Sequence, residues 1–306
     1  MGRTFWLVVC AVLASPSLAF AQRFDSVGVR AQGMAGAFVA VADDASATWW
    51  NPAGLATSLS VLDLSLGVTD GGGRAVALAF PSLGLSYYRL KINQIQPPGS
   101  IALPGSGRQD NGAAGSGLSA SDVGLSQFGA TFGQSITPHL VIATTVKIVN
   151  AQGDTRTDLD AGAMAVFGAV RLGLTVRDLR NPTFGAGGGM FELERRARAG
   201  AAYIAPGYGA LDRVVFAFDA DVNAAHVGGP GGFVEQDVTG GVETWWLRRR
   251  LSVRGGGGRN AATGGEAFGA FGVSVVPYPR VNIDGAVTRG ADSARNRWGI
   301  GLRVTF

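Results

Sequence analysis

The chain has 306 residues, of which only 16% are charged and 48 are glycine, and its formal net charge is +4. A soluble domain typically carries about 25% charged residues, so a mean hydropathy of +0.20 argues against an ordinary soluble protein. Beyond residue 21, however, no apolar run is long enough to cross a bilayer as a helix. High hydropathy without such a run favours a closed β-barrel in which alternate side chains face lipid.

The first 21 residues are predicted to be a secretory signal peptide. Arg3 precedes an apolar run over residues 5–14, and Ala19-Phe20-Ala21 offers small residues for cleavage after the last of them. The alternative, a membrane-anchoring helix, needs a longer apolar run. Cys10 is the only cysteine and lies within this segment, so we expect a mature chain without disulfides, iron–sulfur clusters or cysteine catalysis.

Residues 22–57 do not follow the strand pattern of the later chain and are predicted to form a small helical or irregular hatch. Apolar positions between residues 34 and 42 recur at helical spacing. The run Asn51-Pro52-Ala53-Gly54 then predicts a turn, because proline removes a backbone donor and glycine tolerates positive φ. So short a segment cannot bury a core of its own, and we expect it to lie inside a barrel formed by residues 58–306.

From residue 58 onward, hydrophobicity alternates with the period of a β-strand. The expected connections alternate between long polar loops, the longest over residues 93–121, and short turns, as in outer-membrane barrels with both termini in the periplasm. This pattern predicts an all-β transmembrane barrel of about fourteen antiparallel strands. The expected strands cover residues 60–69, 74–80, 83–92, 123–135, 140–150, 159–167, 170–179, 192–204, 213–223, 234–247, 251–257, 266–276, 280–289 and 296–306.

The last predicted strand ends the sequence on an aromatic residue. Along residues 296–306, apolar side chains alternate with arginine, glycine and threonine, and the final residue is Phe306. A terminal strand of this kind resembles the signal by which the barrel-assembly machinery recognises its clients. We expect it to pair with residues 60–69, which would close the barrel and leave no free edge.

Charged side chains are predicted on the inward face of the strands. Glu243 and Arg254 flank a tight turn and are expected to oppose each other across the sheet. The inward charges either line a polar pathway or form structural ion pairs in a filled lumen, and the sequence leaves both open. Arginine also suits phosphorylated lipid head groups, but no cluster of arginines is evident along the chain. The predicted lumen charges are Lys147, Arg171, Arg177, Asp219, Asp221, Glu243, Arg254, Asp284 and Arg303.

No pattern in the sequence indicates chemistry. Asp158 and Asp160 form a paired-carboxylate motif, as do Asp219 and Asp221, but a calcium site needs six to eight oxygens, usually from one loop. His139 and His226 fall in connections at opposite ends of the barrel, and the glycine-rich runs, including residues 255–258, lack the lysine of a phosphate loop and are expected to be turns. We therefore expect no catalytic residue, metal, cofactor or nucleic-acid partner, and a monomer. Of Trp245 and Trp246, one is expected to enter the lumen, because neighbouring side chains alternate.

The hatch segment carries a family resemblance. The string Arg30-Ala31-x-Gly33-Met34-x-Gly36-Ala37-Phe38-x-Ala40-x-Ala42-Asp43-Asp44, followed by Asn51-Pro52-Ala53-Gly54-Leu55, resembles the amino-terminal hatch of the FadL/TodX outer-membrane transport proteins. PorV-like barrels carry a similar segment. The resemblance covers about a tenth of the chain, which is shorter than FadL and has a polar longest loop.

The resemblance implies a hatch-gated channel in the outer membrane of a Gram-negative bacterium. It would take up hydrophobic small molecules, such as long-chain fatty acids or aromatic hydrocarbons, passively and without chemistry. The candidate ligand-lining residues are Phe24, Met34 and Phe38. The residues expected to hold the hatch fold are Gly33, Gly36, Asp43, Asp44, Asn51, Pro52 and Gly54. The alternative implied by PorV-like barrels is a scaffold or shuttle in protein secretion.

Overall fold

The computed structural model describes most of the chain after the predicted signal peptide. The described residues are 23–24, 27–58, 62–69, 73–93, 122–185, 191–227, 233–262, 267–291 and 295–306. The predicted signal peptide, with its cleavage site at Ala21, lies outside the described residues, as does the expected long loop from residue 94 onward.

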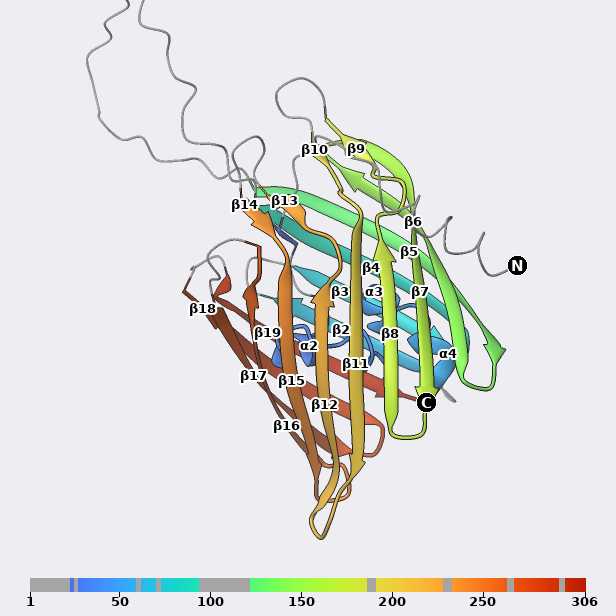
Figure 1. Cartoon of the computed structure of the whole chain (residues 1–306), viewed down its shortest axis with the longest axis vertical. Coiled ribbons are helices and arrows are strands. Elements are labelled where there is room, and N and C mark those ends of the chain that lie inside the picture. The colour runs from blue at the N-terminus through green and yellow to red at the C-terminus, as the bar shows by residue number, and fades with distance from the viewer. Residues whose placement is uncertain are drawn as a thin grey trace, which may run out of the picture.

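Fourteen strands of the described chain close into one antiparallel barrel (Figure 1). Each strand pairs with its sequence neighbours in the barrel, and the last strand pairs with the first, so the predicted strand number and closure are confirmed. The barrel strands are β2 (Asp63–Thr69), β3 (Arg74–Phe80), β4 (Leu83–Asn93), β5 (Asp122–Thr137), β6 (Leu140–Ala151), β7 (Asp154–Phe167), β8 (Val170–Arg177), β11 (Arg196–Pro206), β12 (Leu211–Asp221), β15 (Asp237–Trp246), β16 (Leu251–Asn260), β17 (Ala267–Tyr278), β18 (Val281–Gly290) and β19 (Arg297–Thr305).

The strands alternate between an apolar exterior and a filled interior. On β12, Phe216 and Phe218 point outward and are about half exposed, whereas Val215 and Asp219 point inward and are fully buried. An exterior that leaves so many large apolar side chains uncovered is the lipid-facing surface of a membrane-spanning barrel. The terminal Phe306 is also exposed, and its backbone N–H donates to the carbonyl of Leu62 at 2.9 Å.

No helix in the described part of the chain is long and apolar enough to cross a bilayer.

Three local predictions were wrong. Residues 154–158, expected in a loop, belong to β7, because only Gln152 and Gly153 form the turn after β6. Residues 255–258, expected to be a turn, lie inside β16, where the hatch packs against Gly256. The loop between β8 and β11 contains a short hairpin, β9 (Thr183–Phe184) and β10 (Phe191–Glu192), and the loop between β12 and β15 contains another, β13 (Ala225–Val227) and β14 (Phe233–Glu235). Strands of two or three residues are too short to show a period.

The hatch, which we define in the structure as residues 27–58, lies inside the barrel (Figure 1). It contains three short helices, α2 (Val29–Gly33), α3 (Ala47–Trp50) and α4 (Gly54–Ser58). Helix α2 packs against β16 to β19, and α4 against β4 to β7 on the opposite wall. The helical spacing of residues 34–42 misled the prediction, because positive φ angles at Ala35 and Gly36 turn the chain away from a helix there.

Strand β1 (Arg23–Phe24) precedes the hatch and pairs with the end of β4 that leads into the longest connection. The hatch therefore follows a segment that is bonded to the barrel wall. Because the long connections gather at one end of the barrel and the short turns at the other, we call these the long-connection end and the short-turn end.

Candidate functional site: the hatch and the cavity above it

Glycines in the barrel wall allow the hatch backbone to approach the strands closely. A Cβ atom added to Gly256 would lie 2.5 Å from the backbone carbon of Met34. A Cβ added to Gly162 would lie 2.3 Å from the Asn51 amide oxygen and 2.8 Å from Pro52 Cδ. Real Cβ atoms do not approach other atoms so closely, so a larger residue at either position would displace the hatch. The glycine content of the strands thus reflects, in part, a filled lumen.

Glycines within the hatch are equally constrained. Gly33 faces Gly272 of the wall, and a Cβ added to Gly33 would lie 3.0 Å from the Gly272 Cα. A Cβ added to Gly54 would lie 2.0 Å from the Ala42 carbonyl oxygen. Gly36 adopts a φ of +78°, which side chains disfavour. Gly33 and Gly54 thus lie at close backbone contacts, and Gly36 has a backbone conformation that favours glycine.

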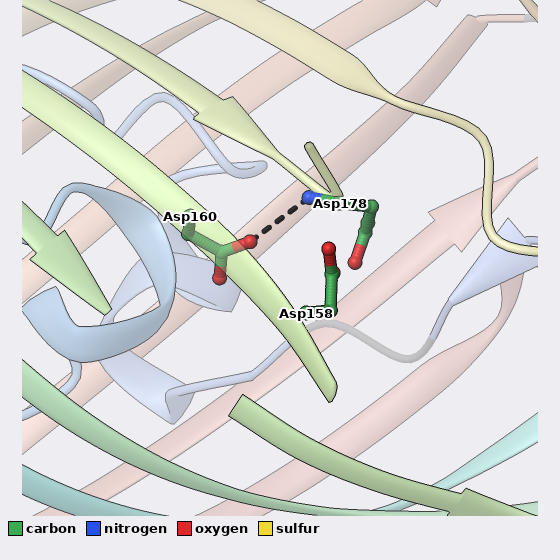
Figure 2. Close-up of side chains that lie close together, drawn as sticks. All are labelled: Asp158, Asp160 and Asp178. Carbon is green, nitrogen blue, oxygen red and sulfur yellow. Dashed lines mark hydrogen bonds between the residues drawn. The ribbon is translucent and has the colours of Figure 1, made fainter. Parts of the chain in front are cut away.

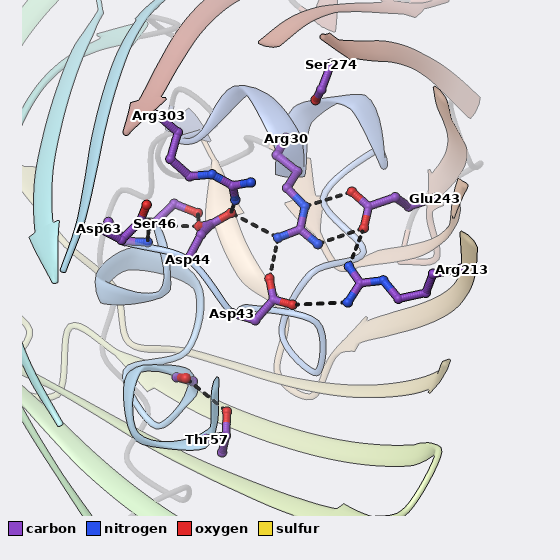
Figure 3. A network of polar contacts seen from close by, with 12 residues as sticks. Arg30, Asp43, Asp44, Ser46, Thr57, Asp63, Arg213, Glu243, Ser274 and Arg303 are labelled. Atoms are coloured by element: carbon purple, nitrogen blue, oxygen red, sulfur yellow. Dashed lines mark hydrogen bonds and ion pairs between the residues drawn. The ribbon is translucent and has the colours of Figure 1, made fainter. Parts of the chain in front are cut away.

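Arg30 of helix α2 is the centre of a buried ion network between the hatch and the wall (Figure 3). Its guanidinium donates two hydrogen bonds to Glu243 of β15, at 2.8 and 2.7 Å. It also contacts Asp44 at 3.0 Å and Asp43, both within the hatch. A planar guanidinium that bridges one wall carboxylate and two hatch carboxylates fixes both the position and the fold of the segment.

Further arginines of the wall balance the carboxylates around Arg30. Arg254 donates to Glu243 at 2.7 Å, as predicted from their positions on neighbouring strands, and the two are directly opposite in the register. Arg213 lies 3.3 Å from Glu243, and Arg303 lies 3.2 Å from Asp44. The members of this group, which we call the Arg30 network, are Arg30, Arg213, Arg254, Arg303, Asp43, Asp44, Glu243 and Asp284.

The network holds Arg30 and Asp43 of the hatch in their charged forms. Burial alone would raise the pKa of Asp43, but the guanidinium groups of Arg30 and Arg213 outweigh burial and hold this pKa below its ordinary value. Burial would likewise lower the pKa of Arg30, whereas the carboxylates of Asp43, Glu243 and Asp44 raise it. Four arginines thus face four carboxylates, so the buried group carries no formal excess charge.

Wall carboxylates also bind the hatch backbone. Asp219 accepts hydrogen bonds from the N–H groups of Phe38 and Val39 at 2.7 and 2.8 Å. Asp63, which the sequence analysis did not single out, accepts one from Ala45 at 2.7 Å. In this irregular segment the N–H groups of Phe38, Val39 and Ala45 donate to no backbone carbonyl of the hatch, and the wall carboxylates satisfy them.

A cavity of about 180 Å³ lies above the hatch at the long-connection end. The hatch forms its floor with Trp49 and Trp50, and the Arg177 guanidinium stacks 3.5 Å from the centre of the Trp49 ring. The Trp50 indole N–H donates to the Val27 carbonyl at 2.7 Å, which fixes the second ring. The charged residues of the cavity wall are Arg177, Arg196, Arg198, Arg295, Arg297, Asp221, Glu235 and Asp237.

A second charged cluster surrounds Lys147 of β6 and is fully buried. Its ammonium nitrogen lies 3.0 Å from Asp158, 2.6 Å from Asp160 and 2.7 Å from Asp178. The three carboxylates converge from β7 and from the residue after β8 (Figure 2). Their arrangement would suit a cation, and the lysine ammonium supplies one. The sequence paired Asp158 with Asp160 but could not bring Asp178 to them.

The other predicted residues are distributed as follows. Met34 and Phe38, the candidate ligand-lining residues, are fully buried between the hatch and its surroundings and do not line the cavity. Phe24 pairs with Ile92 of β4 through its backbone, and its side chain lies outside the described residues. Trp245 faces the lumen and is 5% exposed, whereas the Trp246 indole donates to Thr244 on the other face.

The remaining lumen charges form two groups. Arg171 faces inward on β8, close enough to lower the pKa of Asp43 further. Asp221 contacts Arg198 at 3.3 Å beside the cavity, and Asp284 contacts Arg254 at 3.2 Å within the Arg30 network. Every predicted inward charge thus lies in the lumen, and the ion-pair interpretation describes most of them.

Solved structures of hydrocarbon channels share this architecture. The toluene transporter TbuX of Ralstonia pickettii matches with a TM-score of 0.62 and 12% identity, over 92% of this chain and 98% of that one. The CymD monoaromatic hydrocarbon channel matches with a TM-score of 0.61 and 12% identity, over 92% of this chain and 96% of that one. The toluene transporter TodX of P. putida matches with a TM-score of 0.55 and 11% identity, over 90% of this chain and 97% of that one.

The chain has the fold of these channels. The predicted resemblance to FadL/TodX barrels is therefore confirmed at the level of the fold. No protein-family model and no curated protein sequence matches the chain.

Proposed function

We propose that the chain is an outer-membrane channel for the passive uptake of hydrophobic small molecules, with aromatic hydrocarbons as the first candidates and long-chain fatty acids as the second. In this proposal the hatch is the gate, and no residue performs chemistry. Similarity in fold to channels described as toluene transporters and as a monoaromatic hydrocarbon channel supports the substrate class.

The observation that carries the proposal is the way the hatch fills the lumen. Ion pairs, backbone hydrogen bonds and close contacts hold it, and a cavity on the long-connection side ends on its aromatic residues. An apolar cavity of about 150 Å³ accommodates benzene, so a space of about 180 Å³ over Trp49 and Trp50 is large enough for one aromatic ring. Passage beyond this point requires the hatch to move, which would bring Met34 and Phe38 into contact with the ligand.

A reversible disulfide between hatch and wall tests the gate. The Val29 Cβ lies 3.4 Å from the position that a Cβ would take on Gly301, close to the separation in a disulfide. In the Val29→Cys/Gly301→Cys variant, oxidation should abolish uptake of radiolabelled toluene by cells that express the chain, and a reductant should restore it.

The matched control is a disulfide within the wall. Ala75 Cβ lies 3.8 Å from the Cβ position of Gly67 on the neighbouring strand, so Gly67→Cys/Ala75→Cys cross-links β2 to β3. Oxidation of this control should leave uptake unchanged. Equal toluene uptake by oxidised and reduced hatch-locked protein would show that the hatch is not the gate. Absence of uptake under all conditions, with secreted proteins co-purifying, would favour the PorV-like alternative.

A further inference from the structure

Two arginines face each other on the outside of the barrel wall. Arg74 begins β3 and is directly opposite Arg89 of β4 in the antiparallel register. Both side chains point outward and are exposed. Directly opposed side chains on one face of a sheet have Cβ atoms about 4.5–5.5 Å apart, so the two guanidinium groups can reach a single partner.

Among the residues that the structure describes, this pair has no counter-ion. Neither guanidinium forms a hydrogen bond or an ion pair with any residue that the structure describes. In the register, the nearest acidic residue on β5 is Asp122, four residues beyond the Ser126 that opposes Arg89, or about 13 Å along the strand. Like charges directly opposite each other destabilise a sheet, so this arrangement calls for an anion from outside the chain.

The position of the pair corresponds to the depth of lipid head groups. Arg74 and Arg89 lie at the long-connection end of their strands. One step toward the centre of the barrel, the same face carries Val76 opposite Tyr87, and Phe128 follows on β5; each is between 40% and 47% exposed. Aromatic residues next to the polar rim mark the boundary between hydrocarbon and head groups in outer-membrane barrels.

The polar rim continues from the arginines to the neighbouring strands. Next to Arg89 in the register comes Ser126, then Asn150 of β6 and Thr155 of β7. Asn150 donates to Thr155 at 2.8 Å. This row of hydrogen-bonding side chains lies directly above the apolar surface, so one amphiphilic molecule can contact both.

We propose that Arg74 and Arg89 form a binding site for the phosphate of a phosphorylated lipid of the outer leaflet, of the lipid A type. Each planar guanidinium can donate two parallel hydrogen bonds to phosphate oxygens, and a phosphomonoester carries enough negative charge to neutralise both arginines. The acyl chains then lie along Leu85, Tyr87 and Phe128. The site rests on the outer-membrane location of the barrel and is independent of what the lumen carries.

Binding of defined lipids to the purified full-length barrel tests the site. Native mass spectrometry of the detergent-solubilised protein counts bound lipid A at increasing concentrations. We expect Arg74→Ala/Arg89→Ala to weaken binding of bisphosphorylated lipid A at least tenfold. Dephosphorylated lipid A with the same acyl chains should bind the unmodified barrel as weakly as the phosphorylated form binds the double variant. Arg74→Lys/Arg89→Lys should be intermediate, because lysine keeps the charge but loses the bidentate geometry.

The matched control is Arg289→Ala. Arg289 is also exposed and outward-facing near the long-connection end of β18, but it stands opposite Gly269 and not another arginine. Its substitution should change lipid A binding less than twofold. If Arg289→Ala weakened lipid A binding as much as the double variant does, the effect would come from general surface charge and the proposal would be wrong. Undiminished binding by the double variant, equal binding of dephosphorylated lipid A, or equally tight binding of inorganic phosphate alone would each overturn the proposal. Heat-modifiable migration in gels verifies that every variant is a folded barrel.

Discussion

Removal of the Arg30 side chain should release the hatch while leaving the barrel intact. Arg30→Ala deletes two hydrogen bonds to Glu243 and the contacts with Asp43 and Asp44. Arg213 and Arg254 still neutralise part of the Glu243 charge, but among the described residues only Arg213, at 3.9 Å, stays within ion-pair distance of Asp43. The network then holds one more carboxylate than arginine, in a site closed to water.

The magnitude follows from the cost of breaking a buried ion pair. Removing one partner of such a pair typically costs about 3–5 kcal/mol, because the other charge remains buried without compensation. Since about 1.4 kcal/mol corresponds to a factor of ten, the equilibrium between released and docked hatch should shift by about two to three and a half orders of magnitude. The N–H groups of Phe38 and Val39 still donate to Asp219, so this part of the hatch stays tethered to the wall.

Two measurements report on the hatch. The conductance of single barrels in planar bilayers should rise in Arg30→Ala. In an Ala45→Cys background, where residue 45 is fully buried, the rate of maleimide labelling should rise by a factor comparable to the shift in the equilibrium. Arg156→Ala is the control, because Arg156 and Asp154 form a half-exposed pair at 3.7 Å that contributes little.

A double-mutant cycle separates the Arg30–Glu243 interaction from general loosening. The effects of Arg30→Ala and Glu243→Ala should be clearly non-additive, since the two side chains contact each other directly. Unchanged conductance and labelling in Arg30→Ala, with a barrel that migrates normally in gels, would refute the role of the network in docking the hatch.

Three further results are expected. Gly256→Ala should loosen the hatch by about 1–3 kcal/mol through overlap with Met34, seen as faster maleimide labelling, whereas Gly255→Ala, with no atom within 4 Å, should behave like the unmodified protein. Because the pKa of Asp43 is lowered in the folded protein, its contribution is complete above the unfolded pKa of about 3.9 and is lost as pH falls through the folded pKa. The difference in conductance between Asp43→Asn and the unmodified protein should therefore stay the same from pH 8 to 5 and shrink only below about pH 4. Lys147→Ala should lower the melting temperature, because it leaves three buried carboxylates without their counter-ion. Millimolar Ca²⁺ should restore part of this loss in the variant and leave the unmodified protein unchanged. A melting temperature of the variant that does not respond to Ca²⁺ would contradict this expectation.

Local alternation was sufficient to predict the barrel from the sequence. An alternating strand such as β8 needs no partner to show which face is apolar, because successive side chains point to opposite sides. The strand number and the closure of β19 on β2 followed from counting such segments. The glycine-rich run at residues 255–258 was expected to be a turn, but it continues β16, and its Gly256 allows close packing of the hatch.

The residues of the site were predictable one by one, but their partners were not. Alternation assigned Lys147 and Glu243 to the lumen. It could not predict that Lys147 contacts Asp178, or that Glu243 contacts Arg30, more than two hundred residues away. Those contacts depend on where the hatch lies across the barrel and on the register between strands. Register likewise sets Arg74 opposite Arg89.

The sequence by itself thus determined the membrane-spanning barrel and the small segment that must lie inside it, since both depend on side-chain periodicity and on the inability of short segments to bury a core. Only the tertiary structure decided how the interior is neutralised. A charge in a closed lumen must find its counter-charge in space, and closure of the sheet is what brings distant strands and the hatch to that common volume.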